Sequence, residues 1–161
     1  EKGQHWPGAF WLLGEMQRGD IVPDTITYSA AVSACEKGQH WQGALALLEE
    51  MRRGRVVPNA ITYSAAISAC EKGRLWQEAL GLLRCAERRG LRPDVVSYGA
   101  AISACEKSQE WRGALLQFHG MQITALEPGT IAFGAAISAY EGEGLWERAA
   151  FLLDEMRQGS A

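Results

Sequence analysis

The sequence of 161 residues predicts an all-α fold, a right-handed α-solenoid of about nine helices stacked as antiparallel helix-turn-helix repeats. Three observations lead to this prediction: a 35-residue period along the whole chain, two helical patterns in each period, and short connections between them. The period is visible in the prolines, in the tryptophans, and in the aromatic residues Tyr28, Tyr63, Tyr98 and Phe133. Such a period is typical of solenoids, in which each unit buries its apolar surface against the next unit.

The first helical pattern of each period places apolar and small side chains on one face of a helix. In the first complete unit these residues, spaced i, i+3, i+4 and i+7, are Tyr28, Ala31, Val32 and Cys35. The preceding Pro23-Asp24 predicts a helix start, with Asp24 or Thr27 as the capping residue. Gly38 predicts the helix end, because glycine adopts the left-handed conformation at this position without strain.

The second pattern forms another apolar stripe, made of Trp41, Ala44, Leu45, Leu48 and Met51. Gly54 and then Pro58 end this helix. Connections of a few residues place the two helices of a unit antiparallel to each other. We therefore expect the first helices to line one face of the solenoid and the second helices to line the other.

The period divides the chain into a single repeat array. The predicted units are a partial repeat 1–24, three full repeats 25–59, 60–94 and 95–129, and a near-complete repeat 130–161. Neither end has a polar capping helix, and we expect the side of the first helix that carries Trp6, Phe10 and Leu13 to lack a partner. The array is therefore interpreted as part of a longer array, or as one whose ends are covered by protein partners.

Composition argues against several classes of protein. The chain has 16 Lys and Arg against 19 Asp and Glu, a formal net charge of -3, whereas nucleic-acid binders usually present a basic surface. No apolar run approaches the ~18–20 residues that cross a bilayer, so no membrane insertion is expected. Cys35, Cys70 and Cys105 are 35 residues apart and predict buried free thiols, while Cys85 is expected on a helix flank.

No motif points to catalysis. The chain lacks the glycine-rich phosphate loop, the dinucleotide fingerprint and the zinc-protease motif, and its histidines have no metal-ligand spacing. The Glu-Lys pairs recur in almost every unit, whereas a catalytic site is usually unique. We therefore predict no enzyme, no cofactor and no metal.

Two recurring motifs carry a family resemblance. The first is Pro23-Asp24-Thr25-Ile26-Thr27-Tyr28, and the second is Ala44-Leu45-Ala46-Leu47-Leu48-Glu49-Glu50-Met51. Together with the 35-residue period, they resemble P-type pentatricopeptide repeats. The segment Ser64-Ala65-Ala66-Ile67-Ser68-Ala69-Cys70-Glu71-Lys72-Gly73 is similar to a version of the repeat used in unicellular algae. The resemblance covers the whole chain. It implies binding of single-stranded RNA, not DNA, in a chloroplast or mitochondrion, at one base per repeat along the first helices.

The resemblance implies three kinds of contact with RNA. The first is the sandwiching of bases by an aliphatic residue two positions before each repeated aromatic residue: Ile26, Ile61, Val96 and Ile131. The alternative for these residues is ordinary packing in the first turn of the helix. Both interpretations fit the sequence equally well.

The second kind of contact is base reading by one residue after the aromatic and one residue after the closing proline. By this resemblance the pair Ser29 and Asn59 is expected to recognise adenine, and the pair Ser64 and Asp94 is expected to recognise guanine. In the next unit both positions are glycines, Gly99 and Gly129, which have no side chain to contact a base. Gly134 occupies the position after the aromatic residue in the last unit. The alternative is that Asp24, Asn59 and Asp94 are plain helix N-caps.

The third kind of contact is with phosphate, through a lysine near the end of each first helix: Lys2, Lys37, Lys72 and Lys107. The row stops in the last unit, where Gly142 stands. The alternative is that each lysine offsets its neighbouring glutamate and the negative end of the helix dipole.

RNA binding is not the only function that the sequence allows. An α-solenoid presents an extended surface to proteins as readily as to RNA. The acidic composition and the Gly99/Gly129 pair favour a protein-binding scaffold, or a structural subunit of a large organellar assembly. RNA binding should weaken steeply as salt rises, whereas an apolar protein interface should not.

Overall fold

The computed structural model describes residues 6–158, and in this part of the chain it contains nine helices and no strand. The helices are α1 (Trp6–Arg18), α2 (Thr25–Lys37), α3 (Trp41–Arg53), α4 (Ala60–Lys72), α5 (Trp76–Arg88), α6 (Val95–Lys107), α7 (Trp111–Ile123), α8 (Thr130–Gly142) and α9 (Trp146–Gln158). The predicted all-α solenoid is confirmed. None of these helices has the length and apolar character needed to cross a bilayer.

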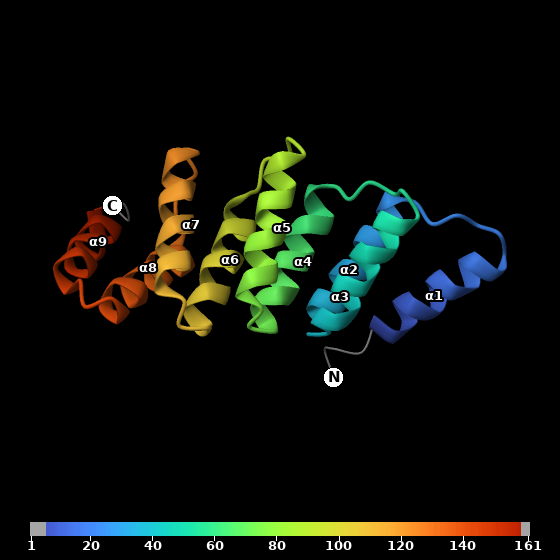
Figure 1. The fold of residues 1–161 in the computed structure, drawn as a ribbon, viewed down its shortest axis with the longest axis horizontal. Coiled ribbons are helices and arrows are strands. Elements are labelled where there is room, and N and C mark those ends of the chain that lie inside the picture. Colours follow the sequence, from blue (N-terminus) through green and yellow to red (C-terminus); the bar gives the residue numbers. More distant parts are fainter. Residues whose placement is uncertain (1–5, 159–161) are drawn as a thin grey trace.

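The helices form a row of antiparallel pairs (Figure 1). The first helices α2, α4, α6 and α8 pack directly on one another, whereas successive second helices make no close backbone contact in the described chain. The first helices are rich in Ala, Ser and Gly, and these small side chains let their backbones approach closely. The first helices therefore form one tight face, and the second helices diverge on the other.

The core between the two layers of helices consists of two clusters of buried side chains, one from α1 to α4 and one from α4 to α9. Cys35, Cys70 and Cys105 are fully buried at the same position of three successive first helices, as predicted. Burial raises the pKa of the Cys35 and Cys105 thiols to about 11 and that of Cys70 to about 12. Cys85 is exposed on α5.

Side-chain caps fix the start of three first helices. Asp24 is the N-cap of α2, and its Oδ1 accepts the backbone N–H of Thr27 at 2.8 Å. This bond and the Thr27 hydroxyl hold the pKa of Asp24 below its usual value. Asn59 and Asp94 cap α4 and α6 in the same way. The capping residue of α2 is thus Asp24 and not Thr27.

The end of α2 differs from the prediction in one respect. The helix ends after Lys37, but Gly38 has a φ of -79°, and the left-handed residue is Gln39 with a φ of 56°. Glycine is needed at position 38 for space, because a Cβ there would lie 2.4 Å from Cδ1 of the Trp6 indole. The glycine therefore makes room for the preceding second helix.

The expectation that Trp6, Phe10 and Leu13 lack a partner was wrong. Leu13 is buried, and the Trp6 ring stacks on the ring of His40 with centroids 4.0 Å apart. These side chains pack on the first complete unit because α1 occupies the place of a second helix before α2. The large apolar side chains that this helix exposes are instead those of Trp11 and Leu12.

Candidate nucleic-acid interface

The aliphatic residues that sequence analysis singled out form an exposed row. Each is the second residue of its first helix, and the exposed fractions are 75% for Ile26, 64% for Ile61, 60% for Val96 and 70% for Ile131. They are therefore not part of the core, and the alternative of first-turn packing does not describe them. We refer to these four residues and the grooves between them as the first-helix face.

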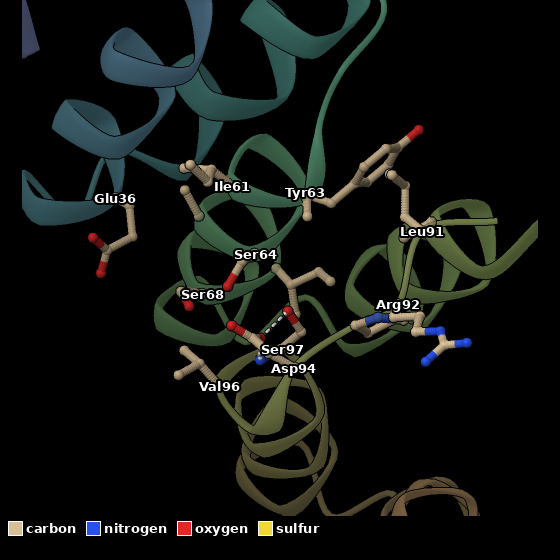
Figure 2. Close-up of a pocket in the computed structure, with 15 residues that line it drawn as sticks. Glu36, Ile61, Tyr63, Ser64, Ser68, Leu91, Arg92, Asp94, Val96 and Ser97 are labelled. Carbon is tan, nitrogen blue, oxygen red and sulfur yellow. Dashed lines mark hydrogen bonds between the residues drawn. The ribbon is translucent and has the colours of Figure 1, made fainter. Parts of the chain in front are cut away.

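A groove of about 430 Å³ lies between Ile61 and Val96. Its lining includes Ser64 from α4 and Asp94 at the start of α6, which is the predicted guanine-reading pair (Figure 2). Figure 2 shows Ser64 and Asp94 facing the same space, with the ring of Tyr63 directed away from it. The structure thus brings the two residues of this pair to one groove.

The next groove, between Val96 and Ile131, is larger, at about 570 Å³. Gly99 and Gly129 line it where the preceding groove has Ser64 and Asp94. Because glycine has no side chain, this groove offers no polar group at the two predicted reading positions.

The Ser29/Asn59 pair is also brought together, with 3.3 Å between Ser29 Oγ and Asn59 Oδ1. Ser29 is only 6% exposed, and its hydroxyl also lies 2.7 Å from the Thr25 carbonyl and 2.7 Å from Thr62 Oγ1. The hydroxyl is therefore occupied inside the protein. Asn59 is half-buried and is the member of the pair that borders solvent.

The alternative role of the reading residues as N-caps is also observed, and the two roles use different atoms. The caps of α4 and α6 use Oδ1 of Asn59, 2.9 Å from Thr62 N, and Oδ1 of Asp94, 2.8 Å from Ser97 N. The amide nitrogen of Asn59 and Oδ2 of Asp94 are not used by these caps. A helix cap thus orients each side chain and leaves one polar atom for a ligand.

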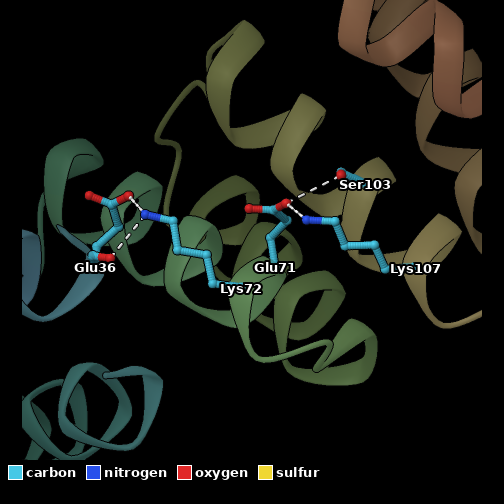
Figure 3. A network of polar contacts seen from close by, with 5 residues as sticks. All are labelled: Glu36, Glu71, Lys72, Ser103 and Lys107. Carbon is cyan, nitrogen blue, oxygen red and sulfur yellow. Dashed lines mark hydrogen bonds and ion pairs between the residues drawn. The ribbon is translucent and has the colours of Figure 1, made fainter. Parts of the chain in front are cut away.

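The lysines make contacts that the sequence did not indicate. Lys72 forms an ion pair with Glu36 and donates a further hydrogen bond to the Glu36 carbonyl at 3.0 Å (Figure 3). Lys107 forms the same ion pair with Glu71, and the Ser103 hydroxyl donates to that carboxylate at 3.3 Å. Each pair joins one unit to the next, whereas the sequence-based alternative paired every lysine with its neighbouring glutamate. The two residues of each ion pair are 36 residues apart in the sequence, and this spacing is the sequence feature that could have predicted the pairs.

These ion pairs lower the positive charge of the first-helix face. Glu36 lines both grooves, and Glu71 lines the larger one. Lys37 is exposed on α2, and Lys2 lies outside the described residues. Glu106 has Gly142 at the position of the expected lysine, and it has no ion pair within the described chain. No cluster of three or more metal-ligating side chains occurs in residues 6–158.

Comparison with known families gives two matches. A model described as the pentatricopeptide repeat domain matches residues 11–72 and 81–143, and a model of the single PPR repeat matches residues 61–91 and 131–159. Together they span most of the chain.

Solved structures of similar shape carry the same repeat. The PPR domain of protein-only RNase P 1 from Arabidopsis thaliana, in complex with tRNA, has a TM-score of 0.86 at 17% identity over 97% of this chain. PPR10 from maize has a TM-score of 0.69 at 26% identity over 98% of the chain. PPR10 in complex with an 18-nt psaJ RNA element has a TM-score of 0.71 at 20% identity over 92% of the chain.

The lengths of these proteins differ from that of the chain. The matched region covers 82% of the RNase P domain but only 22% of PPR10. No curated protein matches the sequence.

Proposed function

Because the chain belongs to the pentatricopeptide repeat family, we propose that it binds single-stranded RNA along its first-helix face. The observation that carries the proposal is the exposed row Ile26, Ile61, Val96 and Ile131. The last three of these residues line the two grooves. Aliphatic side chains that line a groove in a regular exposed row suit flat apolar ligands such as bases. Two similar solved structures contain RNA, one a tRNA and the other an 18-nt element.

In this proposal each unit takes one base, held between the aliphatic side chains of consecutive units. The base between Ile61 and Val96 would meet Ser64 and Asp94 in the smaller groove. A contact of this kind with the face of a base tolerates any sequence, so selectivity has to come from polar atoms at the base edge.

The atoms that the caps leave available explain the proposed selectivity. Asp94 offers a carboxylate oxygen, which only accepts hydrogen bonds, and the Watson–Crick edge of guanine presents N–H donors to it. Asn59 offers an amide N–H₂, which donates, and N1 of adenine accepts. The unit with Gly99 and Gly129 has no such atom, so we propose that it accepts a base without preference.

The expected affinity is modest. Stacking contributes ~1–3 kcal/mol per base for aromatic side chains, and aliphatic contacts should contribute no more. The three bases held between the four aliphatic residues therefore supply at most about 9 kcal/mol, of which association costs at least about 4 kcal/mol. Binding at micromolar concentration requires about 8 kcal/mol, so we expect this array to bind RNA more weakly than that. By family resemblance we also propose that it acts in a chloroplast or mitochondrion.

A second candidate function is a scaffold for proteins. The observation that favours it is the pairing of Lys72 with Glu36 and of Lys107 with Glu71, which leaves less positive charge for phosphates. An apolar protein surface would then cover the aliphatic row. The two functions differ in their dependence on salt, because only phosphate binding releases counterions.

The deciding experiment is retention of a random single-stranded RNA pool by the protein at low and moderate salt, followed by sequencing. RNA binding predicts salt-sensitive retention with enrichment of adenine followed by guanine, assigned to Asn59 and to Ser64 with Asp94. Absence of retention at low salt would reject the RNA proposal and favour the scaffold.

A further inference from the structure

A third groove, of about 380 Å³, lies on the opposite layer of the solenoid, between the second helices α3 and α5. It exists because these helices make no close backbone contact with each other. We call it the Tyr63 groove; it is lined by Leu45, Leu48, Glu49, Arg52, Arg55, Val56, Val57, Pro58, Tyr63, Leu82, Cys85 and Arg89. It shares only Tyr63 with the groove of Ser64 and Asp94, and Figure 2 shows the Tyr63 ring directed away from that groove.

The hydroxyl of Tyr63 has no hydrogen-bond partner within the described chain, although the side chain is only 6% exposed. The equivalent tyrosines of the neighbouring units are satisfied. Tyr28 donates to Glu50 at 2.9 Å, and Tyr98 donates to Glu87 at 2.8 Å. No buried side-chain oxygen among the described residues lacks a partner, so the Tyr63 hydroxyl oxygen is itself open to solvent in the groove and is free to bind a ligand there.

The repeat pattern explains why Tyr63 lacks a carboxylate. Glu50 stands 22 residues after Tyr28, and the residue 22 positions after Tyr63 is Cys85. Glu87 stands 11 residues before Tyr98, and the residue 11 positions before Tyr63 is Arg52. The two places that hold an acid in other units therefore hold a thiol and a guanidinium here.

The groove is positively charged. Glu49 binds Arg52 through two hydrogen bonds of 2.8 Å, so these two charges cancel. Arg55 and Arg89 have no ion pair among the described residues. Arg89 lines the groove together with Tyr63. Burial raises the pKa of Tyr63, and the positive charge of Arg89 opposes this rise.

We propose that the Tyr63 groove binds a phosphate monoester attached to an apolar or aromatic body. The groups that would meet the phosphate are the donors of Arg55, Arg89 and the Tyr63 hydroxyl, and a phosphate carries about -1.5 to -2 at pH 7. Leu45, Leu48 and Leu82 supply walls for the apolar body. The volume of the groove lies at the lower end of the range of small-molecule sites, which is about 300–1,000 Å³.

The reactivity of the Cys85 thiol can report whether a ligand occupies the Tyr63 groove. Cys85 lines the groove and is exposed, while the other three cysteines are buried. The experiment measures the rate at which iodoacetamide alkylates Cys85, by mass spectrometry, with phenyl phosphate, inorganic phosphate or phenol present. Phenyl phosphate should slow alkylation several-fold at concentrations where phenol and inorganic phosphate have little effect. Equal protection by phenol, or no protection at millimolar phenyl phosphate, would overturn the proposal.

Variants separate the proposed contacts from an effect on folding. Tyr63→Phe should weaken protection by phenyl phosphate roughly tenfold, since a hydrogen bond to a charged group is lost, and Arg89→Gln should abolish protection. Tyr98→Phe is the matched control, because Tyr98 is the same residue of the next unit and does not line this groove. Equal weakening in Tyr98→Phe would contradict a specific role for Tyr63.

A 5′-phosphorylated oligoadenylate serves as a further probe beside free adenosine 5′-monophosphate, because a nucleic-acid end and a free nucleotide present the same phosphate chemistry. Stronger protection by the oligonucleotide would assign the groove to nucleic-acid ends, and stronger protection by the free nucleotide would assign it to a free metabolite. Neither result depends on RNA binding at the first-helix face, so the two proposals fail independently.

Discussion

Asn59 has one observed role, as a helix cap, and one proposed role, as a reader of a base. Its Oδ1 accepts the Thr62 backbone N–H, and the Thr62 hydroxyl accepts the Asn59 backbone N–H at 3.3 Å, which completes a capping box. The remaining amide nitrogen is the atom proposed to meet adenine. Because both roles depend on the same side chain, loss of RNA binding in an Asn59 variant does not by itself identify a reader.

Replacing Asn59 by Asp separates the two roles. Asp24 and Asp94 already cap their helices here, so Asn59→Asp should leave the free energy of unfolding within about 0.5 kcal/mol of the parent. Asn59→Ala should lower it by about 1 kcal/mol. Urea unfolding measures both changes, and RNA selection with the Asp variant should move the preference from adenine toward guanine. An unchanged preference would remove Asn59 as a reader.

Gly73 ends α4 at a point where the ring of Trp41 approaches the backbone closely. A Cβ at this position would lie 2.7 Å from Cδ1 of Trp41, so Gly73→Ala should destabilise the fold by about 1–3 kcal/mol. Gly81 lies inside α5, where a Cβ would have no atom within 4 Å, and Gly81→Ala should stabilise the fold by about 0.5–1 kcal/mol. Urea denaturation of the two variants should therefore give opposite signs. Similar effects would show that the tryptophan contact does not limit position 73.

Part of the candidate site could be predicted residue by residue. The 35-residue period placed Ile26, Ile61, Val96 and Ile131 in one row, but their exposure depends on how consecutive helices pack. Ser29 was named as a reader because of its position, yet packing against Thr62 of the next unit buries it. The spacing of residues within one unit could not predict which side chains contact each other between units.

At the scale of helices, the ion pairs of Glu36 with Lys72 and of Glu71 with Lys107 connect α2 to α4 and α4 to α6. An RNA phosphate that binds these lysines has to compete with a carboxylate already in place. The glutamates therefore should weaken RNA binding rather than assist it.

Replacing Glu36 and Glu71 together by Gln should increase RNA affinity several-fold and steepen its salt dependence. Each lysine that gains a phosphate contact adds about 0.7 to the slope of log affinity against log salt for a single strand. Glu106→Gln is the control, since it removes an acid that has no ion pair in the described chain. Filter binding over a salt series measures both quantities. If the double variant binds no better than the control, the lysines do not contact phosphate.

The whole molecule should lose stability at alkaline pH. The thiols of Cys35, Cys70 and Cys105 have pKa values of about 11, 12 and 11 in the fold, against 9.0 for an exposed thiol. Their folded pKa values are raised, so their contribution to stability is complete below about pH 9 and is lost as the pH rises through about 11–12. Between these limits each thiol lowers the free energy of unfolding by up to about 1.4 kcal/mol per pH unit.

Urea unfolding at about pH 8, 9, 10 and 11 checks this expectation. Cys70→Ala should reduce the alkaline loss of stability, and it should also lower the free energy of unfolding at every pH because a buried side chain is shortened. A profile that is flat from about pH 9 to 10 would contradict the burial of the thiols.

The overall architecture was accessible from the sequence because each unit repeats the same local signals. Asp24, Asn59 and Asp94 begin helices at the expected places, and α2, α4 and α6 share one apolar pattern. The grooves were not accessible, since they arise from the different spacing of the two layers. The Tyr63 groove in particular depends on α3 and α5 standing apart.

Helices touch only their own unit and the adjacent units in the described chain. A duplication or deletion of one complete unit would therefore create no contact that the array does not already contain. Growth or shortening of the gene by whole repeats should be tolerated far better than a change of a few codons, which would put every following helix out of step with its neighbour. The packing of the chain thus makes its length easy to change in evolution, while its period is hard to change.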